Sequence, residues 1–462
     1  MKSATDLQER YRAIPSVQEL LQAPEFHAYS IAPQYLKQII QEEIHRLRQS
    51  LPRRSTLTPE RIPHVLMEAI RSRLEGIVHP RLIRVINATG IILHTNMGRA
   101  PLAEAARKAI GEAAEHYCNL EIDLGTGRRG DRMAHVEELL CLLTGAEAAL
   151  VVNNCAAAVF LVLNSLCKKK EVPVSRGELV EIGGSFRMPE VMKASGAKMV
   201  EVGTTNKTHL QDYEEVISAR TGALLKVHTS NYRILGFTAG VAAPELVTLA
   251  HRHDLPVIYD MGSGVIQDLQ QWGYSHEPLA REMVEAGVDV ITFSGDKILG
   301  GPQAGIILGK RRYVQKIRRN HLTRALRCDK LILAALEATL RLYLEPEKLP
   351  QRLPIAGLLT VSRETLHRRG ERLCSEVTSA HLHLEVVEAF AQMGSGALPL
   401  EKIPSVAVKV TSSRFSPLKL AEKLRRHHPP IVGYVQEDAF FLNLRTVRED
   451  ELETLTKALN SL

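Results

Sequence analysis

The sequence lacks the features of a membrane, secreted or zinc-ribbon protein. No apolar run approaches the roughly 20 residues that span a bilayer. The first eleven residues are polar and lack the apolar core of a signal peptide. The six cysteines form no Cys-x-x-Cys pair, which argues against a zinc ribbon or a thioredoxin motif. We therefore expect a soluble, cytoplasmic protein with reduced thiols.

Metal-binding patterns, internal repeats and low-complexity segments are also missing. The close histidine pairs His251/His253 and His427/His428 have no carboxylate or thiol partners at metal spacing, so no metal is expected. The 462 residues exceed what one hydrophobic core usually holds. With 45% apolar and 24% charged residues, the composition is that of an ordinary globular protein of two or three domains.

Hydrophobic periodicity predicts three domains: residues 1–80, 81–345 and 346–462. The first has helical patterns over 34–49 and 59–76, and no strong strand pattern. In the second, short apolar strands alternate with amphipathic helices, which indicates an α/β fold with a mostly parallel sheet covered on both faces. The third predicts a smaller α+β domain.

The element boundaries follow from the same patterns. Ser16 and Glu19 have the spacing of a helix capping box. The strands expected in the central sheet are residues 149–153, 198–202, 223–229, 256–260, 288–294 and 305–308. The helices expected around it are residues 101–118, 154–167, 212–219, 244–253, 279–286 and 329–345. The last domain is expected to contain strands 384–390, 405–410, 431–437 and 440–447, with a hairpin near 437–439, and helices 416–427 and 449–461.

Positive charge is concentrated in one segment. The chain has a net charge of +7, whereas residues 310–330 contain nine Lys or Arg and one Asp. A solvated helix face would explain this, but the segment closely follows the candidate lysine described next. We favour a site for phosphate groups, from a small molecule or from RNA.

Lys297 is the central candidate residue. An apolar strand, residues 288–293, leads into Ser294 and the glycine-rich run 294–305. A lysine at a strand end can point its amine into a ligand crevice, and Schiff-base chemistry requires an amine held in a partly dry pocket. Ser294 is placed to bond a phosphate from the same turn. By itself the pattern also fits an ordinary surface lysine.

A phosphate-binding turn is predicted at residues 151–158. An apolar strand ends there and a helix begins, so free N–H groups and the helix dipole would hold a phosphate. Asn154, Cys155 and Ala156 are the expected contacts, mostly through their backbone. Cys155 is a poor candidate for a nucleophile because no histidine lies near it in the sequence.

Asp260 ends another apolar strand, 37 residues before Lys297. A carboxylate at a strand end is often only a turn residue. In the right place, however, it can pair with the protonated ring nitrogen of pyridoxal phosphate and keep the ring an electron sink.

The order of these elements resembles the fold type I, aspartate aminotransferase-like class of pyridoxal phosphate enzymes. The order is a phosphate turn, a strand-end Asp260, then Ser294 and Lys297 on one alternating sheet. The resemblance covers roughly residues 85–460. It implies that Lys297 holds the cofactor as a Schiff base, in a dimer with active sites at the subunit interface. It also implies a ring-stacking side chain about thirty residues after the phosphate turn, where Phe186 lies.

Three stretches narrow the resemblance to one family: residues 86–102, 175–186 and 294–305. Together they are similar to the bacterial selenocysteine synthases, the L-seryl-tRNA(Sec) selenium transferases. The resemblance implies conversion of L-seryl-tRNA(Sec) to L-selenocysteinyl-tRNA(Sec). Lys297 removes the Cα proton and the serine hydroxyl leaves, giving aminoacrylyl-tRNA, to which selenium from selenophosphate then adds. A decamer, built as a ring of dimers, is also implied.

The same resemblance gives roles to other residues. Arg99, Arg324 and Arg327 would bind selenophosphate, with a salt network at a dimer interface as the alternative. Residues 1–80 would read the tRNA, although their net charge is only +2 and an oligomerisation domain is the alternative. Arg445 lies where this class often holds a substrate carboxylate, which is esterified in seryl-tRNA, and we assign it no role.

Two other functions fit part of the sequence. A related lyase acting on a small amino sugar acid would share Lys297, Asp260 and the phosphate turn, but such relatives typically lack the helical N-terminal extension. A non-catalytic tRNA-binding protein would have no need of both Asp260 and Lys297. No DNA or membrane partner is expected.

Overall fold

The computed structural model describes residues 2–182, 186–398 and 401–462. Contacts divide the chain into two compact units, Met1–Arg84 and Val85–Leu462. We call them the N-terminal unit and the second unit. In the described part of the chain, no helix is both long enough and apolar enough to cross a membrane.

The N-terminal unit is helical. Its α-helices are α1 (Lys2–Arg12), α2 (Val17–Leu21), α3 (Pro24–His27), α4 (Pro33–Ser50) and α5 (Ile62–Val78). The predicted helices at 34–49 and 59–76 are confirmed, except that residues 59–61 form a 3-10 turn. The capping box is confirmed as well, since the Ser16 and Glu19 side chains each accept the other's backbone N–H. Ile40 and Ile70 are fully buried in its separate core.

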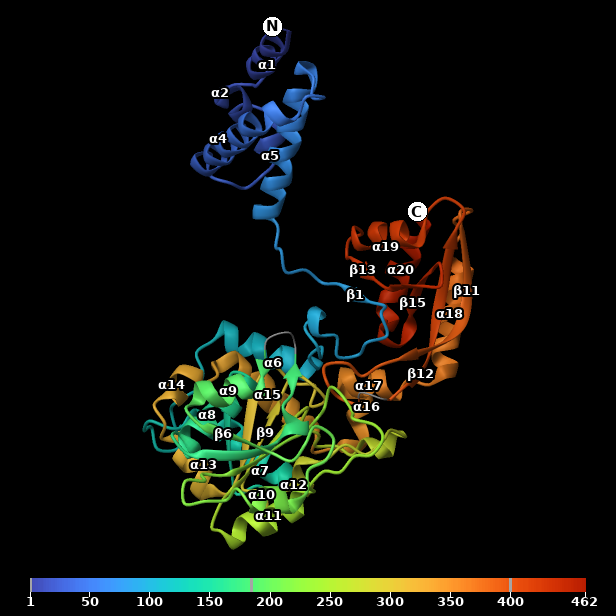
Figure 1. Cartoon of the computed structure of the whole chain (residues 1–462). Helices are drawn as coiled ribbons and strands as arrows, with labels where there is room; N and C mark the ends of the chain where they lie inside the picture. The colour runs from blue at the N-terminus through green and yellow to red at the C-terminus, as the bar shows by residue number, and fades with distance from the viewer. Residues whose placement is uncertain (1, 183–185, 399–400) are drawn as a thin grey trace. The chain divides into compact units, whose positions relative to one another are not determined.

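The second unit is built on a seven-stranded sheet (Figure 1). Its strands are β2 (Ala148–Val152), β3 (Glu171–Ser175), β6 (Lys198–Val202), β7 (Leu224–Val227), β8 (Val257–Gly262), β9 (Val290–Ser294) and β10 (Gly305–Gly309). Their order is β2-β10-β9-β8-β7-β3-β6. Only β10 runs antiparallel to its neighbours, so the predicted mostly parallel sheet is confirmed.

Every residue of β2, β9 and β10 is buried, which shows that both faces of this sheet are covered by helices. Helix α8 packs across those three strands, while α11 packs on β7 and β8 and α12 on β9. The helices of this layer system are α6 (Glu104–Glu115), α7 (Glu137–Thr144), α8 (Cys155–Cys167), α9 (Met188–Ser195), α10 (Leu210–Glu214), α11 (Ala243–Arg252), α12 (Ala280–Glu285), α13 (Arg311–Arg318), α14 (Leu322–Leu326) and α15 (Lys330–Leu342).

The C-terminal part of the second unit has its own hydrophobic cluster around a four-stranded sheet of order β11-β12-β15-β14 (Figure 1). Its elements are α16 (Leu349–Arg352), α17 (Pro354–Thr360), α18 (Arg363–Glu376), β11 (Leu382–Ala391), β12 (Ile403–Ser412), α19 (Pro417–Arg425), β13 (Ile431–Val432), β14 (Tyr434–Gln436), β15 (Ala439–Asn443) and α20 (Leu452–Asn460). The strand β1 (Ile86–Asn87) pairs in parallel with β13, and β4 (Glu181–Ile182) pairs with β5 (Phe186–Arg187). The domain boundary predicted near residue 345 stays a prediction.

The structure corrects several predicted elements. Strand β3 was not predicted, because Pro173 lies within it and proline usually marks an edge or a turn. The strand expected over 431–437 is interrupted at Gly433, where a Cβ would come 2.3 Å from the carbonyl oxygen of Phe441. The strand expected over 440–447 ends at Asn443, whose side chain accepts the N–H of Arg445 and starts a 3-10 turn. The hairpin is confirmed, since β14 and β15 are antiparallel.

Candidate active site at the carboxyl ends of the strands

Lys297 lies just after β9 and is only 5% exposed. Backbone hydrogen bonds close the glycine-rich turn around it, including one from Gly300 N–H to the carbonyl of Lys297 at 2.9 Å. Its amine lies 3.9 Å from the point that a Cβ on Gly262 would occupy, at the end of β8. The apolar strand β9 therefore places Lys297 at the same edge of the sheet as Asp260, as the sequence predicted.

Asp260 is buried in β8 and is held by neighbours rather than by solvent. Its Oδ1 accepts the Thr292 hydroxyl at 2.9 Å and the Cys155 thiol at 3.5 Å. Burial raises the pKa of Asp260, and the hydrogen bond from Thr292 and the charge of Lys297 oppose that rise. This carboxylate is suited to a cationic N–H partner, which would stabilise its ionised form.

The charges at the site are coupled. Burial lowers the pKa of Lys297, while Cys155 and Asp260 act in the opposite direction. Burial also raises the pKa of the Cys155 thiol well above its ordinary value, so the thiol is neutral near pH 7. The charges of Asp260, Arg99 and Asp296 also act on Lys297, but burial dominates and lowers its pKa, which leaves more of the amine deprotonated.

The predicted phosphate turn connects β2 to α8. Asn154 caps the helix by accepting the Ala157 N–H at 2.8 Å. The N–H groups of Cys155 and Ala156 are at the first helical positions, so they have no acceptor within the helix. They lie at the positive end of the helix dipole. Gly305 allows a close approach here, because a Cβ on it would lie 2.0 Å from the carbonyl oxygen of Asn154. The Ser294 side chain acts to lower the pKa of the Cys155 thiol, against the rise that burial causes.

Arg99 approaches the site from another segment. Its Nη1 lies 2.6 Å from Oδ2 of Asp296, the residue before Lys297. Its backbone has φ of 62°, a left-handed conformation that non-glycine residues rarely adopt. Its Nε is buried without a hydrogen-bond partner among the described residues. Strain and an unused donor in one side chain are typical of a functional position.

Arg324 and Arg327 lie in and just after α14, beside the end of β2. Asn153 N–H bonds the carbonyl of Leu326 at 2.9 Å, which fixes this segment next to the phosphate turn. Arg327 lies 3.7 Å from Glu121, which also binds Arg132. Arg324 forms no ion pair with any residue in the described ranges. No interaction of either arginine with Arg99 is observed in those ranges.

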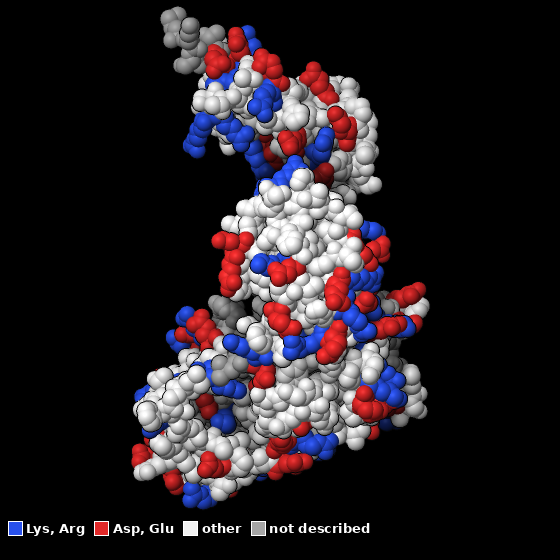
Figure 2. Space-filling view, turned by 90° about the vertical axis from the view of Figure 1, so that its right-hand side faces the viewer, with Lys and Arg blue, Asp and Glu red and all other residues white. Residues whose placement is uncertain are grey.

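Three other cations of the basic segment, Lys310, Arg312 and Arg318, form ion pairs within the described residues. Lys310 lies 2.7 Å from the fully buried Asp289, and Arg318 lies 2.7 Å from Glu137. On the face in Figure 2, basic and acidic side chains are interspersed. In contrast to Lys310, Arg312 and Arg318, Arg324 lies near the phosphate turn and makes no ion pair within the described ranges.

Phe186 lies in β5 and packs, partly buried, against the main core. Residues 183–185 of the same motif lie outside the described residues. Its role in ring stacking stays a prediction.

Arg445 is used structurally. It is 3% exposed and donates hydrogen bonds to the carbonyls of Leu358, Leu359 and Pro404. A side chain engaged in this way braces the C-terminal part and is not presented to a substrate.

Sequence reasoning missed two polar residues at this edge. Thr292 pairs in register with Asp260 across β9 and β8, and Ser230 follows β7. The polar run His228-Thr229-Ser230-Asn231 after an apolar strand was the available signal for Ser230.

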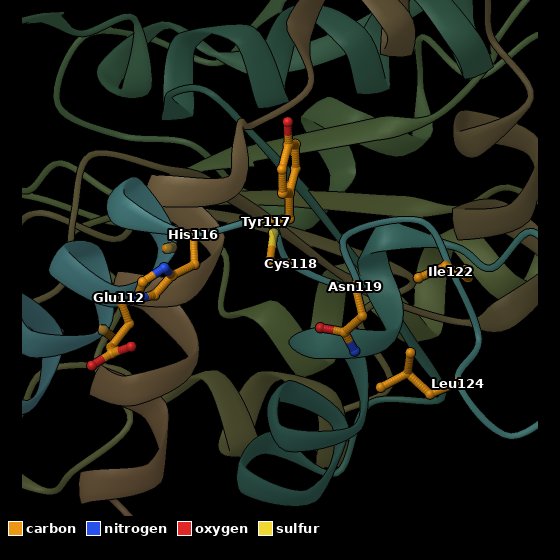
Figure 3. A pocket seen from close by; sticks show the side chains of 9 residues that line it. Glu112, His116, Tyr117, Cys118, Asn119, Ile122 and Leu124 are labelled. Atoms are coloured by element: carbon orange, nitrogen blue, oxygen red, sulfur yellow. The ribbon is translucent and has the colours of Figure 1, made fainter.

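A hollow lies at the end of α6 (Figure 3). It is lined by the helix end and by the segment that follows, including His116, Tyr117 and Leu124. Tyr117 and Leu124 are strongly exposed, with 106% and 76% of their side-chain reference area. Exposed apolar side chains in one place are typical of a contact surface.

The sheet order, together with the positions of Asp260 and Lys297 at the carboxyl ends of the strands, is that of the fold type I class, the fold of the aspartate aminotransferase-like pyridoxal phosphate enzymes. A solved structure of D-glucosaminate-6-phosphate ammonia-lyase has this fold, with a TM-score of 0.58 and 21% identity over 82% of this chain and 95% of that one.

The family follows from sequence comparison. The family model described as L-seryl-tRNA selenium transferase (SelA) matches residues 85–448. The L-seryl-tRNA(Sec) selenium transferase of Alkaliphilus metalliredigens is 50% identical over 86% of this chain and 85% of its own. That of Carboxydothermus hydrogenoformans is 46% identical over 98% of both chains. The chain belongs to this family and is an enzyme.

Proposed function

We propose that the protein converts L-seryl-tRNA(Sec) to L-selenocysteinyl-tRNA(Sec) in selenocysteine biosynthesis, with selenophosphate as the selenium donor. The observation that carries the proposal is the cluster of the buried Lys297, Asp260 and Thr292 with the half-buried Cys155, in a chain of this family. The similarity to the ammonia-lyase structure supports only the shared fold. The match to the Carboxydothermus hydrogenoformans transferase, at 46% identity over 98% of this chain, also covers the N-terminal unit.

The residues fit pyridoxal phosphate. The N–H groups of Cys155 and Ala156 would bind its phosphate, Asp260 its ring nitrogen and Lys297 its aldehyde carbon. A buried carboxylate with a raised pKa gains most from a cationic partner, and a buried amine with a lowered pKa is deprotonated to a greater extent than an exposed lysine at the same pH. When bound, the cofactor accepts the electron pair released as the Cα–H bond of serine breaks.

Lys297 would hold the cofactor through its amine and, once that amine is free, would act as the base that takes the Cα proton of serine. The same amine would pass this proton to the serine hydroxyl, which would leave from Cβ as water. Because the lysine side chain is 5% exposed, few water molecules compete for that proton.

The three arginines would bind the selenium donor. Arginine is suited to phosphate because its planar guanidinium donates two parallel hydrogen bonds. Arg324 is free of ion pairs within the described residues, and Arg99 has a buried unused Nε. Selenium would bond to Cβ while Cα regains a proton, and water would attack phosphorus as the Se–P bond breaks, so that inorganic phosphate leaves.

The N-terminal unit would bind the tRNA in this proposal. The net charge of this unit, Met1–Arg84, is only +4, so shape and a few contacts would matter more than charge attraction. An oligomerisation role is the alternative. A tRNA substrate places the enzyme in the cytoplasm.

The active enzyme would be a dimer-based oligomer, a decamer in its full form. The exposed Tyr117 and Leu124 support a subunit contact at the rim in Figure 3. Glu121 in the same segment holds Arg327, so such a contact would lie close to the donor site.

The test is selenium transfer by purified protein. Seryl-tRNA(Sec) and seryl-tRNA(Ser) are supplied separately with selenophosphate, and selenium in aminoacyl-tRNA is measured. We expect incorporation on the first tRNA alone. A folded protein that carries the cofactor but labels neither tRNA would rule the proposal out in favour of a small-molecule lyase.

A further inference from the structure

Ser230 has a buried hydroxyl with no partner. It follows β7 and is 0% exposed, and its Oγ makes no hydrogen bond in the described part of the chain. Its backbone is fixed, since Ser230 N–H bonds the carbonyl of His228 at 2.8 Å. A buried hydroxyl normally finds an acceptor, so an unused one at a sheet edge points to a ligand.

The side chains of the polar residues next to Ser230 already form hydrogen bonds. The His228 ring bonds Glu277 at 2.9 Å, and the Asn231 amide bonds the carbonyl of Glu181 at 2.9 Å. The Thr229 hydroxyl accepts from Arg233 at 3.4 Å. Ser230 is therefore the residue after β7 whose side chain is available.

The hydroxyl faces the same small volume as the lysine amine. A Cβ on Gly262 would lie 3.4 Å from Ser230 Oγ and 3.9 Å from Lys297 Nζ. A Cβ on Gly396 would lie 3.0 Å from the same Oγ. Two glycines thus leave the space around the hydroxyl open, on the side where the amine lies.

The sheet order shows which part of a bound ring this hydroxyl would meet. Along the edge, the phosphate turn follows β2, Lys297 follows β9, Asp260 is in β8 and Ser230 follows β7. In pyridoxal phosphate the phosphate arm and the C3 oxygen lie on opposite sides of the line from the ring nitrogen to the aldehyde carbon. With the phosphate toward β2 and the nitrogen on Asp260, the C3 oxygen faces β7.

We propose that Ser230 is a positioning residue whose hydroxyl donates a hydrogen bond to the C3 oxygen of pyridoxal phosphate. The inference rests on the proposed function, because it needs that cofactor at Lys297. A hydrogen bond donated to the C3 oxygen reduces the negative charge on that oxygen. The C3 oxygen lies beside the nitrogen atom that would join Lys297 to the cofactor. That nitrogen then loses its proton at a lower pH, which favours attack by a substrate amine at neutral pH.

The first test is a pH titration of the cofactor's visible absorption band in the holoenzyme. Ser230→Ala should move its midpoint up by about one pH unit and weaken cofactor binding about fivefold. Ser263→Ala is the matched control, since Ser263 is 1% exposed and its hydroxyl is already used on the carbonyl of Gly396 at 2.8 Å. The control should leave the midpoint unchanged.

The second test separates this role from a structural one. In the cofactor-free protein, Ser230→Ala removes an unsatisfied hydroxyl and should keep or raise the melting temperature, whereas Ser263→Ala should lower it. An unmoved titration midpoint in Ser230→Ala, with wild-type protein that binds the cofactor, overturns the role of Ser230 whatever the melting temperature does. Wild-type protein that shows no visible band with pyridoxal phosphate overturns the proposed function itself, and this inference with it.

Discussion

Arg99 and Asp296 form an ion pair of 2.6 Å directly beside Lys297. The carboxylate orients the guanidinium, and the left-handed backbone of Arg99 shows that the chain tolerates strain to place it there. An incoming phosphate group must share Arg99 with Asp296. This balance suggests a site that binds a donor anion and then releases inorganic phosphate.

Arg99→Lys should impair the donor site alone. Lysine keeps the charge opposite Asp296 but loses the planar fork, so the KM for selenophosphate should rise on the order of tenfold. Exchange of the serine Cα proton with solvent deuterium should stay near the wild-type rate. Arg107→Lys, on the exposed face of α6, is the control. An unchanged KM would remove Arg99 from the donor site.

Lys297→Ala should abolish both the visible absorption band and turnover, because the amine that holds the cofactor and takes the proton is gone. Spectra and selenium incorporation measure the two effects. Lys193→Ala, an exposed lysine on α9, should match wild type in both. Activity retained in Lys297→Ala would refute the role of this lysine.

Asp260→Asn should keep the cofactor bound but slow the proton step. Asparagine can still accept from Thr292, but it cannot supply the negative charge that stabilises a protonated ring nitrogen. We expect Cα–H exchange to fall about a hundredfold or more. Asp254→Asn, just before β8 and exposed, is the control, since asparagine tolerates its φ of 55°. Equal exchange rates in the two variants would contradict the assignment.

Arg324→Ala combined with Arg327→Ala should separate the two halves of the reaction. Cα–H exchange should persist, because Lys297 and Asp260 are untouched, while selenium incorporation should fall by about a hundredfold or more. Arg319→Ala, exposed in the same basic segment, should do neither. Equal loss of both activities would favour a subunit salt network over a donor site.

The stability of the cofactor-free protein should depend on pH through Lys297. Burial lowers the pKa of Lys297 from 10.5, so between that lowered value and 10.5 the unfolded chain holds a proton that the folded chain lacks. The free energy of unfolding contributed by this group therefore rises with pH across that window. Urea titrations at neutral to alkaline pH should show the rise in wild type and in Lys193→Met, and a smaller rise in Lys297→Met. Parallel curves for all three proteins would show that Lys297 is not desolvated.

The sequence predicted the local parts of the site well. Lys297 and the turn at Asn154 each follow an apolar strand and Asp260 lies near the end of one, which continues to Gly262, and such positions can be read from one segment alone. Thr292 was missed because its link to Asp260 depends on the register of two strands 32 residues apart.

Other features were hidden for the same reason. The basic segment appeared free because its partners, such as Asp289 and Glu137, come from elsewhere in the chain. Arg445 was expected in a strand, since the cap that Asn443 provides is set by packing and not by periodicity. Non-local partners, not local patterns, account for these errors.

Gly305 has a consequence for the biosynthesis of the protein itself. It pairs with Val152 on one side and Ser294 on the other, so a single residue of β10 joins the phosphate turn to the lysine turn. The two turns are far apart in the chain, and β10 emerges from the ribosome after both. A nascent chain therefore cannot assemble the cofactor site until β10 has been inserted, so uptake of the cofactor reports that this sheet has finished folding.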